Sequence, residues 1–149
     1  MQKAGIDYIG VCVVVWTYNA RGHVLLHRRG PLCRDENGCW DICAGSLEFG
    51  ETPEECMRRE VAEEIGVEVI SSQLLGTRNV LRRTGDSDYL THWVSIDYKA
   101  LIEIDRPRII ELGKADEIAW FSPFALPYPL SSPLSLFATK YSLAPAMGV

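Results

Sequence analysis

Three glutamates close together in the middle of the chain are the residues best suited to do chemistry. Glu60, Glu63 and Glu64 stand at spacings i, i+3 and i+4, which puts them side by side on one helix face. Like charges at these spacings repel by roughly 0.2–0.5 kcal/mol per pair. A bound cation would remove that repulsion. Hard oxygen ligands without histidine or thiolate select Mg²⁺, Mn²⁺ or Ca²⁺ over zinc, so the pattern indicates a site for such an ion.

The position of these glutamates on the helix bears on this interpretation. Met57, Val61 and Ile65 form an apolar stripe, and the glutamates lie within an arc of about 100° that begins at its edge. The carboxylates are therefore expected close to the packed side. Mg²⁺ also takes phosphate oxygens as ligands and lowers the pKa of a bound water, which suggests hydrolysis at phosphorus. Taken alone, the segment REVAEEIG is more typical of a solvated, glutamate-rich helix face, and the longer stretch to which it belongs decides between the two interpretations.

The helix that carries the glutamates has clear start and end signals. Thr52 is an N-cap residue, Pro53 occupies the first helical position, and Glu55 completes a capping box. Gly66 stands where a glycine commonly ends a helix. The sequence therefore predicts a helix over residues 52–65.

The other segments predict a mixed sheet between two helices, within a single domain spanning residues 1–149. Ser132 as N-cap and Pro133 after it predict a C-terminal helix through about Tyr141. Two hairpins are expected, the second around the turn TGDSD at residues 84–88. Strands are predicted at residues 9–16, 23–29, 39–43, 74–83, 89–102 and 117–121.

Composition limits the classes of partner and compartment. The 149 residues carry 15 Lys and Arg against 20 Asp and Glu, a formal charge of −5, which disfavours a nucleic-acid partner. The apolar run at residues 9–16 is far shorter than the roughly 20 residues of a membrane span, so no membrane association is expected. Five cysteines without a CxxC pair favour reduced thiols in the cytoplasm.

The glutamates belong to a longer stretch that runs from Gly45 to Val67, G-SLEFG-E-TPEECMR-REVAEEIGV. It resembles the Nudix box, G-x5-E-x7-R-E-U-x-E-E-x-G-U with U aliphatic, and every specified position matches. A chance match has a probability on the order of 10⁻⁹ per starting position. The matching residues are Gly45, Glu51, Arg59, Glu60, Val61, Glu63, Glu64, Gly66 and Val67.

The resemblance implies a fold and an activity. Nudix domains are α/β/α sandwiches with a mixed β-sheet between helices, and they cleave a diphosphate linked to another moiety by water attack on phosphorus. The reaction needs a divalent cofactor, here Mg²⁺ with Mn²⁺ as an alternative. Carried over, Glu60 and Glu64 would be the main metal ligands, and Glu63 either a further ligand or the base that activates water. Glu48 and the backbone carbonyl of Ala44 would complete the site.

The resemblance also implies structural roles within the box. Arg59 and Glu51 would pair and hold the loop against the helix, although Arg59 could instead form an i,i+4 pair with Glu63. Gly45 and Gly66 would allow the turns at the two ends of the helix.

Candidate substrate-binding residues lie outside the box. Arg28 and Arg29 end a strand where guanidinium groups could grip phosphates, or they are a solvated strand end. Trp120 and Phe121 lie in EIAWF, which resembles the family segment beside the base pocket, where an aromatic ring stacks on a nucleobase. Core packing is the expected role of at least one of these two.

Asp116 and Glu117 precede this segment, in a region where some family members place an extra catalytic carboxylate. Cys43 and Ala44 replace the Pro-Gly pair of many triphosphate-cleaving members, and an Ala-Gly pair there also occurs in ADP-ribose and nucleotide-sugar hydrolases. Cys43 is expected to be a buried, inert thiol.

The resemblance favours a small nucleoside-triphosphate pyrophosphatase, which releases a monophosphate and pyrophosphate from a (deoxy)nucleoside triphosphate. Arg82 and Arg83 stand where ADP-ribose hydrolases usually carry a proline, and LPYPL before the last helix resembles the triphosphate enzymes. An ADP-ribose or nucleotide-sugar pyrophosphatase and a non-catalytic nucleotide sensor are the alternatives. The expected partner is a small nucleotide, and the chain is compatible with a monomer or a homodimer.

Overall fold

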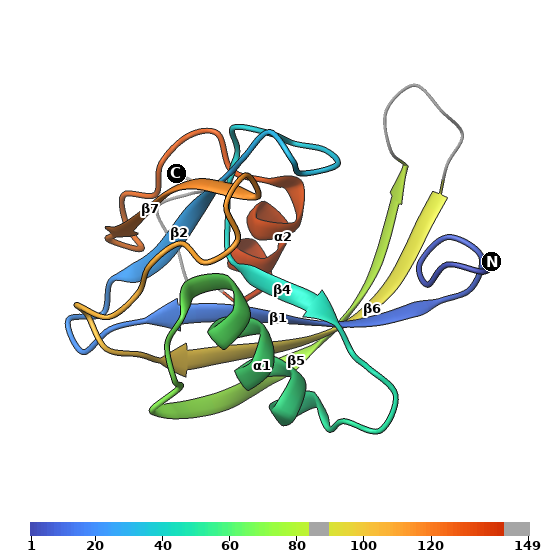
Figure 1. The fold of residues 1–149 in the computed structure, drawn as a ribbon, viewed down its shortest axis with the longest axis horizontal. Helices are drawn as coiled ribbons and strands as arrows, with labels where there is room; N and C mark the ends of the chain where they lie inside the picture. The colour runs from blue at the N-terminus through green and yellow to red at the C-terminus, as the bar shows by residue number, and fades with distance from the viewer. Residues whose placement is uncertain (84–89, 142–149) are drawn as a thin grey trace.

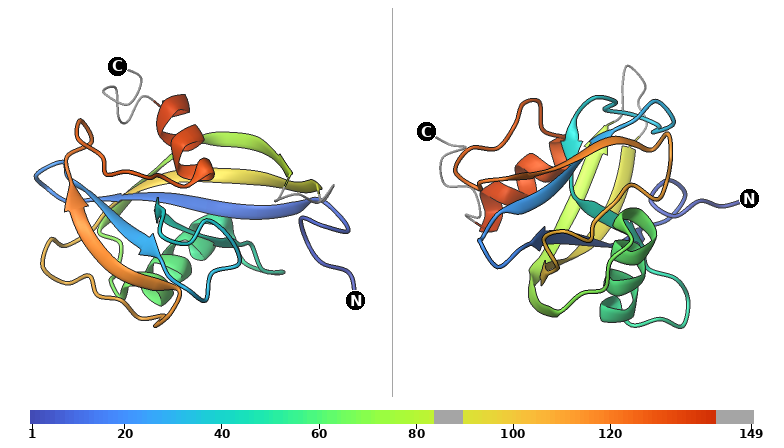
Figure 2. Two further views of the ribbon diagram at one scale, coloured as in Figure 1. Left: turned by 90° about the horizontal axis from the view of Figure 1, so that it is seen from above. Right: turned by 60° about the vertical axis from the view of Figure 1, so that its left-hand side comes forward.

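A seven-stranded mixed sheet lies between two helices in the computed structural model, which describes residues 1–83 and 90–141. The main path of the sheet runs β3-β2-β1-β6-β5, with β4 paired to β1 and β7 paired to β2. Helix α1 covers one face and α2 the other, as Figure 1 and the left view of Figure 2 show. The predicted sandwich is confirmed.

The elements follow the predicted segments, with one division. The segment at residues 39–43, expected as one strand, is divided at Ile42 into two. In the described part of the chain no helix is long and apolar enough to cross a membrane. The elements are β1 (Gly10–Tyr18), β2 (Val24–Arg29), β3 (Trp40–Asp41), β4 (Cys43–Ser46), α1 (Pro53–Ile65), β5 (Ser71–Arg83), β6 (Leu90–Leu101), β7 (Ala115–Phe121) and α2 (Ser132–Tyr141).

The first predicted hairpin is largely splayed apart. Strands β1 and β2 share one registered pair, Tyr18↔Val24, next to their turn. Strand β4 takes the place beside β1, antiparallel from Val15↔Cys43 to Cys12↔Ser46, and β2 pairs along its length with β7 instead. On its other side β1 runs parallel to β6, which makes the sheet mixed.

The second predicted hairpin is confirmed. Strands β5 and β6 pair antiparallel from Ser71↔Leu101 to Arg83↔Leu90, with a register shift between Leu74 and Gly76. The predicted turn at residues 84–88 lies outside the described residues.

Alternation along β1 supplies a core to each face of the sheet. Val13 and Val15 pack towards α1, where the predicted stripe of Met57, Val61 and Ile65 is at most 2% exposed. Val14 and Trp16 pack on the other side, towards Leu134 and Phe137 of α2. Burial of each such side chain contributes about 1.5–3 kcal/mol. The backbone of α1 is therefore held tightly against the sheet.

The start of α2 differs by one residue from the prediction. The hydroxyl of Ser131 accepts the Leu134 N–H at 3.2 Å, so Ser131 caps the helix and Ser132 is its first residue. The prediction of Ser132 as N-cap was wrong because the two adjacent serines offer the same local signal. The tertiary structure distinguishes them, since Glu36 accepts hydrogen bonds from both the N–H and the hydroxyl of Ser132.

Candidate active site

The ends of α1 fix the orientation of its acidic face. The Thr52 hydroxyl accepts the Glu55 N–H at 3.1 Å, and the Glu55 carboxylate accepts the Thr52 N–H at 2.9 Å, which forms the predicted capping box. Gly66 adopts a left-handed conformation with φ 69° and donates its N–H to Ala62 O at 3.0 Å. The three glutamates of the box therefore share one helix face, as predicted.

Arg59 lies at the centre of the acidic residues and forms ion pairs with four of them. Its guanidinium is 2.7 Å from Glu51, 2.8 Å from Glu60, 3.3 Å from Glu63 and 3.7 Å from Glu48. The hydrogen bond from Arg59 lowers the pKa of Glu51 to about 2. The predicted pair with Glu51 is thus present, and the i,i+4 pair with Glu63 is present as well.

Glu60 and Glu64 are shielded from water. The Glu60 side chain is 13% exposed, and burial raises its pKa. The Glu64 carboxylate accepts the Ala44 N–H at 3.1 Å, and burial followed by the charges of Glu60 and Glu111 raises the pKa of Glu64 well above its ordinary value. Ionised carboxylates are disfavoured in such a place unless a cation is present.

Gly45 has a different role from the one predicted for it. It lies within β4, where a Cβ atom would be 2.0 Å from the carboxylate carbon of Glu60. Glycine is therefore required for the close approach of strand and carboxylate, and the prediction that it allows a turn was wrong. Gly66 alone of the two serves a turn.

The donor atoms at this face suit a divalent ion that prefers oxygen. Carboxylates and the carbonyls of the β4 loop are ligands of the kind that Mg²⁺ and Mn²⁺ take. Glu60 and Glu63 are turned towards Arg59, and among residues 1–83 and 90–141 no three His, Cys, Asp or Glu side chains converge on one metal position. The ligand set Glu60, Glu63, Glu64, Ala44 and Glu48 stays a prediction.

These five residues all line one open cleft of about 620 Å³, referred to below as the acidic cleft. Arg59 lines it too. The cleft also brings in residues that the sequence did not single out, from the ends of β2 and the loops on either side of the sheet edge. Among them are His27, Arg34, Glu111 and Lys114. Burial lowers the pKa of His27, so its imidazole is disposed to be neutral.

Glu111 lines the cleft in addition to the glutamates of the Nudix box. Asp116 and Glu117, the candidates from sequence, pair instead with Arg28 at 2.8 and 3.6 Å, and none of these three lines the cleft. Glu111 lies on the long connection before β7, where no spacing rule selects one residue. The same connection also contains Glu103 and Asp105, so the sequence offers no signal that selects Glu111.

The two arginines predicted to grip phosphates are both bound by carboxylates. Arg28 pairs as described above. Arg29 lines the cleft, but its guanidinium lies 3.1 Å from Asp35 and 3.1 Å from Asp41. Arg34 is exposed at the cleft and makes no ion pair with any residue that the structure describes.

Trp120 and Phe121 are partly buried and pack against the two cores. The Trp120 indole packs on the α1 side and donates to Ile104 O at 2.9 Å. Phe121 packs edge-on against Trp40 on the α2 side, with ring centroids 5.0 Å apart. Neither lines the acidic cleft, and both pack at the edge of a core.

A second hollow of about 250 Å³, referred to below as the side pocket, opens on the α2 face of the sheet. It shares Arg34 and residues 44–46 with the acidic cleft, so the two hollows meet at β4. Its wall Trp93 is held in place by close backbone packing, because a Cβ at Gly5 or Gly10 would lie 2.3 or 2.5 Å from the ring. The other lining residues are Cys12, Val14, Val80, Arg82, Thr91, Ser95 and Pro133.

The fold agrees with solved structures of similar proteins. A MutT NUDIX hydrolase from Burkholderia pseudomallei has a TM-score of 0.73 and 26% identity, covering 89% of this chain and 97% of that one. The NUDIX domain of Shewanella oneidensis NrtR, crystallised with ADP ribose, has a TM-score of 0.64 and 20% identity, covering 95% and 90%. The second likeness shows the fold alone.

Curated relatives match over shorter stretches. A dihydroneopterin triphosphate diphosphatase from Escherichia coli is 30% identical over 56% of this chain and 51% of its own length. An 8-oxo-dGTP diphosphatase from Proteus vulgaris is 45% identical over 32% and 42%. The NAD-capped RNA hydrolase NudC from Pseudomonas aeruginosa is 42% identical over 40% of this chain, and the match spans 20% of that protein. The family model described as NUDIX domain matches residues 9–140, and the chain therefore belongs to the Nudix family of hydrolases.

Proposed function

We propose that this protein is a divalent-metal-dependent pyrophosphohydrolase that cleaves a (deoxy)nucleoside triphosphate to a monophosphate and pyrophosphate. The observation that carries the proposal is the junction of the two hollows at β4. An acidic cleft suited to a metal-bound phosphate chain adjoins a smaller, more apolar pocket walled by Trp93. The side pocket is smaller than the roughly 300–1,000 Å³ typical of a whole ligand site, so it suits one part of a ligand, such as a nucleobase.

The relatives favour a triphosphate over a capped RNA. The matches to proteins named as acting on triphosphates span 42% and 51% of those proteins, against 20% of the NAD-capped RNA hydrolase. The net charge of −5 also disfavours binding a polyanionic RNA chain. The partner proposed here is a small nucleotide.

The reaction would divide the work among the box residues. Glu60 and Glu64, with Glu48 and the Ala44 carbonyl, would hold Mg²⁺ or Mn²⁺, which supplies charge screening and a more acidic water. A carboxylate accepts the proton of the attacking water as oxygen bonds to phosphorus and the bond to the leaving phosphate oxygen breaks. Glu63 is the candidate for that base, because it is the most exposed of the three at 54%.

Arg59 and Glu51 act as positioning residues in this proposal. Arg59 also donates to Ser46 O at 3.1 Å, so one guanidinium ties the β4 loop to the acidic face of α1. A divalent ion would compete with Arg59 for Glu60 and Glu63, while the pair with Glu51 keeps the guanidinium in place.

The test is a turnover screen of the purified protein with Mg²⁺, with and without EDTA. The panel contains normal and oxidised triphosphates, dihydroneopterin triphosphate, ADP-ribose, nucleotide sugars and dinucleoside polyphosphates. Metal-dependent release of pyrophosphate from a triphosphate supports the proposal. Release of a sugar phosphate and a nucleoside monophosphate would replace it with the ADP-ribose or nucleotide-sugar activity. Binding without any turnover would replace it with a nucleotide sensor.

The base is identified by comparing Glu63→Gln with Glu111→Gln. Loss of the base lowers kcat by about 10²–10⁴-fold and leaves metal affinity near that of the wild type. Loss of a ligand weakens the metal dependence instead. A kcat defect in Glu111→Gln with full activity in Glu63→Gln would assign the base to the connection before β7.

A further inference from the structure

We propose that Arg34 binds the phosphate that links the group in the side pocket to the phosphate chain in the acidic cleft, and that Glu36 positions Arg34 for this contact. This inference rests on the proposed function in one respect: the ligand must have a phosphate chain and a second group that binds in the side pocket. It assigns a binding role to the loop at residues 30–39, which joins β2 to β3 and is referred to below as the connecting loop.

The location of Arg34 is the first observation. It lines both hollows, together with residues 44–46. A ligand with its phosphates over α1 and its other part against Trp93 must pass this point. A guanidinium there would contact the phosphate that joins the two parts of the ligand. Its planar fork of N–H donors suits phosphate oxygens.

The second observation concerns the ion pairs of the basic side chains that line the acidic cleft. Arg29 is bound to Asp35 and Asp41, Arg59 to four glutamates, and Lys114 lies 3.8 Å from Glu111. Arg34 differs from these, because it has no ion-pair partner among the described residues. It is therefore the cleft cation best able to bind a phosphate without first breaking an ion pair.

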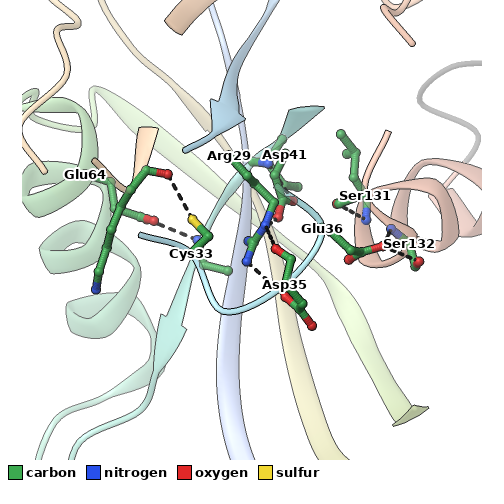
Figure 3. Close-up of polar contacts among 12 residues, drawn as sticks. Arg29, Cys33, Asp35, Glu36, Asp41, Glu64, Ser131 and Ser132 are labelled. Carbon is green, nitrogen blue, oxygen red and sulfur yellow. Dashed lines mark hydrogen bonds and ion pairs between the residues drawn. The ribbon is translucent and has the colours of Figure 1, made fainter. Parts of the chain in front are cut away.

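Hydrogen bonds to neighbouring segments fix the conformation of the connecting loop. At one end the Gly30 N–H and the Cys33 thiol both donate to Lys114 O, at 2.9 and 3.0 Å. On the next turn Arg29 donates to the carbonyl of Asp35 at 3.0 Å and to its carboxylate at 3.1 Å. Figure 3 shows Cys33 on the side of α1, Arg29 and Asp35 in the middle, and Glu36 with Ser132 on the side of α2.

Glu36 anchors the far end of the connecting loop. Its carboxylate accepts the N–H of Ser132 at 2.9 Å and lies 3.2 Å from the Arg82 guanidinium, which itself lines the side pocket. Glu36 has φ 51°, a left-handed conformation that non-glycine residues rarely adopt. Two residues, Ser132 of α2 and Arg82 of β5, thus hold Glu36 in a conformation the isolated loop would avoid, and Arg34 lies two residues away.

The experiment measures steady-state kinetics of Arg34→Ala, Arg34→Lys and Glu36→Gln on the substrate found in the screen. Arg21→Ala is the matched control, because Arg21 is an exposed arginine in the β1–β2 turn that lines neither hollow. Removing Arg34 is expected to raise KM about tenfold or more and to change kcat much less, since a charge-assisted contact made in both ground and transition state is lost. Arg34→Lys, which keeps the charge and loses the fork, is expected to lie between.

Glu36→Gln separates positioning from plain loop stability. It is expected to raise KM in the wild-type background and to have little further effect on KM in the Arg34→Ala background, because its influence passes through Arg34. An equal effect in both backgrounds would overturn the positioning role. KM of Arg34→Ala within about twofold of wild type, as for Arg21→Ala, would overturn the binding role.

A binding measurement keeps this inference distinct from the proposed function. The rise in Tm on addition of each Mg²⁺–nucleotide is recorded for the wild type and for Arg34→Ala. If the wild type binds without turnover and Arg34→Ala loses the shift, the proposed function fails and the role of Arg34 stands. If Arg34→Ala keeps the full shift, or if the wild type binds no nucleotide of the panel, the role of Arg34 falls.

Discussion

The carboxylate of Glu51 accepts two hydrogen bonds from the guanidinium of Arg59, at 2.7 and 3.1 Å. Glu51 ends the loop of the Nudix box and Arg59 lies in the middle of α1, so this fork fixes the loop to the helix. The same carboxylate accepts the Glu48 N–H at 2.9 Å, which closes the loop on itself. The two residues therefore hold the loop of the box against the acidic face of α1.

This pairing predicts that the stability of the protein falls at acid pH. Arg59 lowers the pKa of Glu51 from 4.5 to about 2, so the folded protein binds fewer protons than the unfolded chain between these values. The stabilisation is present above pH 4.5 and is lost as the pH falls towards 2. Tm measured against pH for the wild type and Glu51→Gln should differ most at neutral pH and converge in acid. A difference that is constant down to pH 3 would contradict the pairing.

Glu64→Gln is expected to abolish turnover and to stabilise the metal-free protein. Burial raises the pKa of Glu64, so above pH 4.5 the unfolded chain loses this proton while the folded protein keeps it, and stability falls until the pH passes the raised pKa; glutamine has no charge to desolvate. We expect activity to fall by at least about 10²-fold. Tm without metal should rise, and the increase in Tm on adding Mg²⁺ should shrink. Glu68→Gln, an exposed site just beyond α1, is the control and should behave as the wild type.

Gly45→Ala is expected to damage the site far more than the fold. The added Cβ meets the carboxylate end of Glu60, which can swing away, so the free energy of unfolding should change by no more than about 1 kcal/mol. The displaced carboxylate should weaken the Mg²⁺ dependence of turnover by about tenfold or more. Titration of activity with Mg²⁺, beside chemical unfolding, measures both. Normal Mg²⁺ dependence would show that Glu60 is no ligand.

Cys43 is expected to be unreactive although it adjoins Ala44. It is 2% exposed, and burial together with the nearby Glu64 raises its pKa well above the ordinary value. Peptide mapping after iodoacetamide treatment at pH 8 should find Cys43 unmodified in the native protein and modified after unfolding. Cys33, which is partly exposed, is the internal comparison. Native labelling of Cys43 as fast as of Cys33 would contradict its burial.

Local spacing alone determined the helix and its acidic face. The capping box of Thr52 and Glu55, the glycine at residue 66 and the i, i+3, i+4 glutamates depend on contacts within one helix and its ends, and all are present in the structure. The apolar stripe of Met57, Val61 and Ile65 follows for the same reason, since burial on one side of a helix depends on the helical period. The pairing of Arg59 with Glu51 came from the resemblance to the Nudix box.

Only the tertiary structure decided what surrounds that face. The place of Gly45 against Glu60, the splaying of β2 from β1, the position of Glu111 at the cleft and the lack of an ion-pair partner for Arg34 among the described residues all depend on contacts between segments far apart in the chain. Trp120 and Phe121 illustrate the same dependence on tertiary structure. The sequence of a strand does not show whether the ring of an aromatic residue faces a ligand or the core. Contacts within one helix or strand depend on the spacing of residues in the sequence. The neighbours of a side chain across the sheet depend on the paths of the loops and on which strands pair.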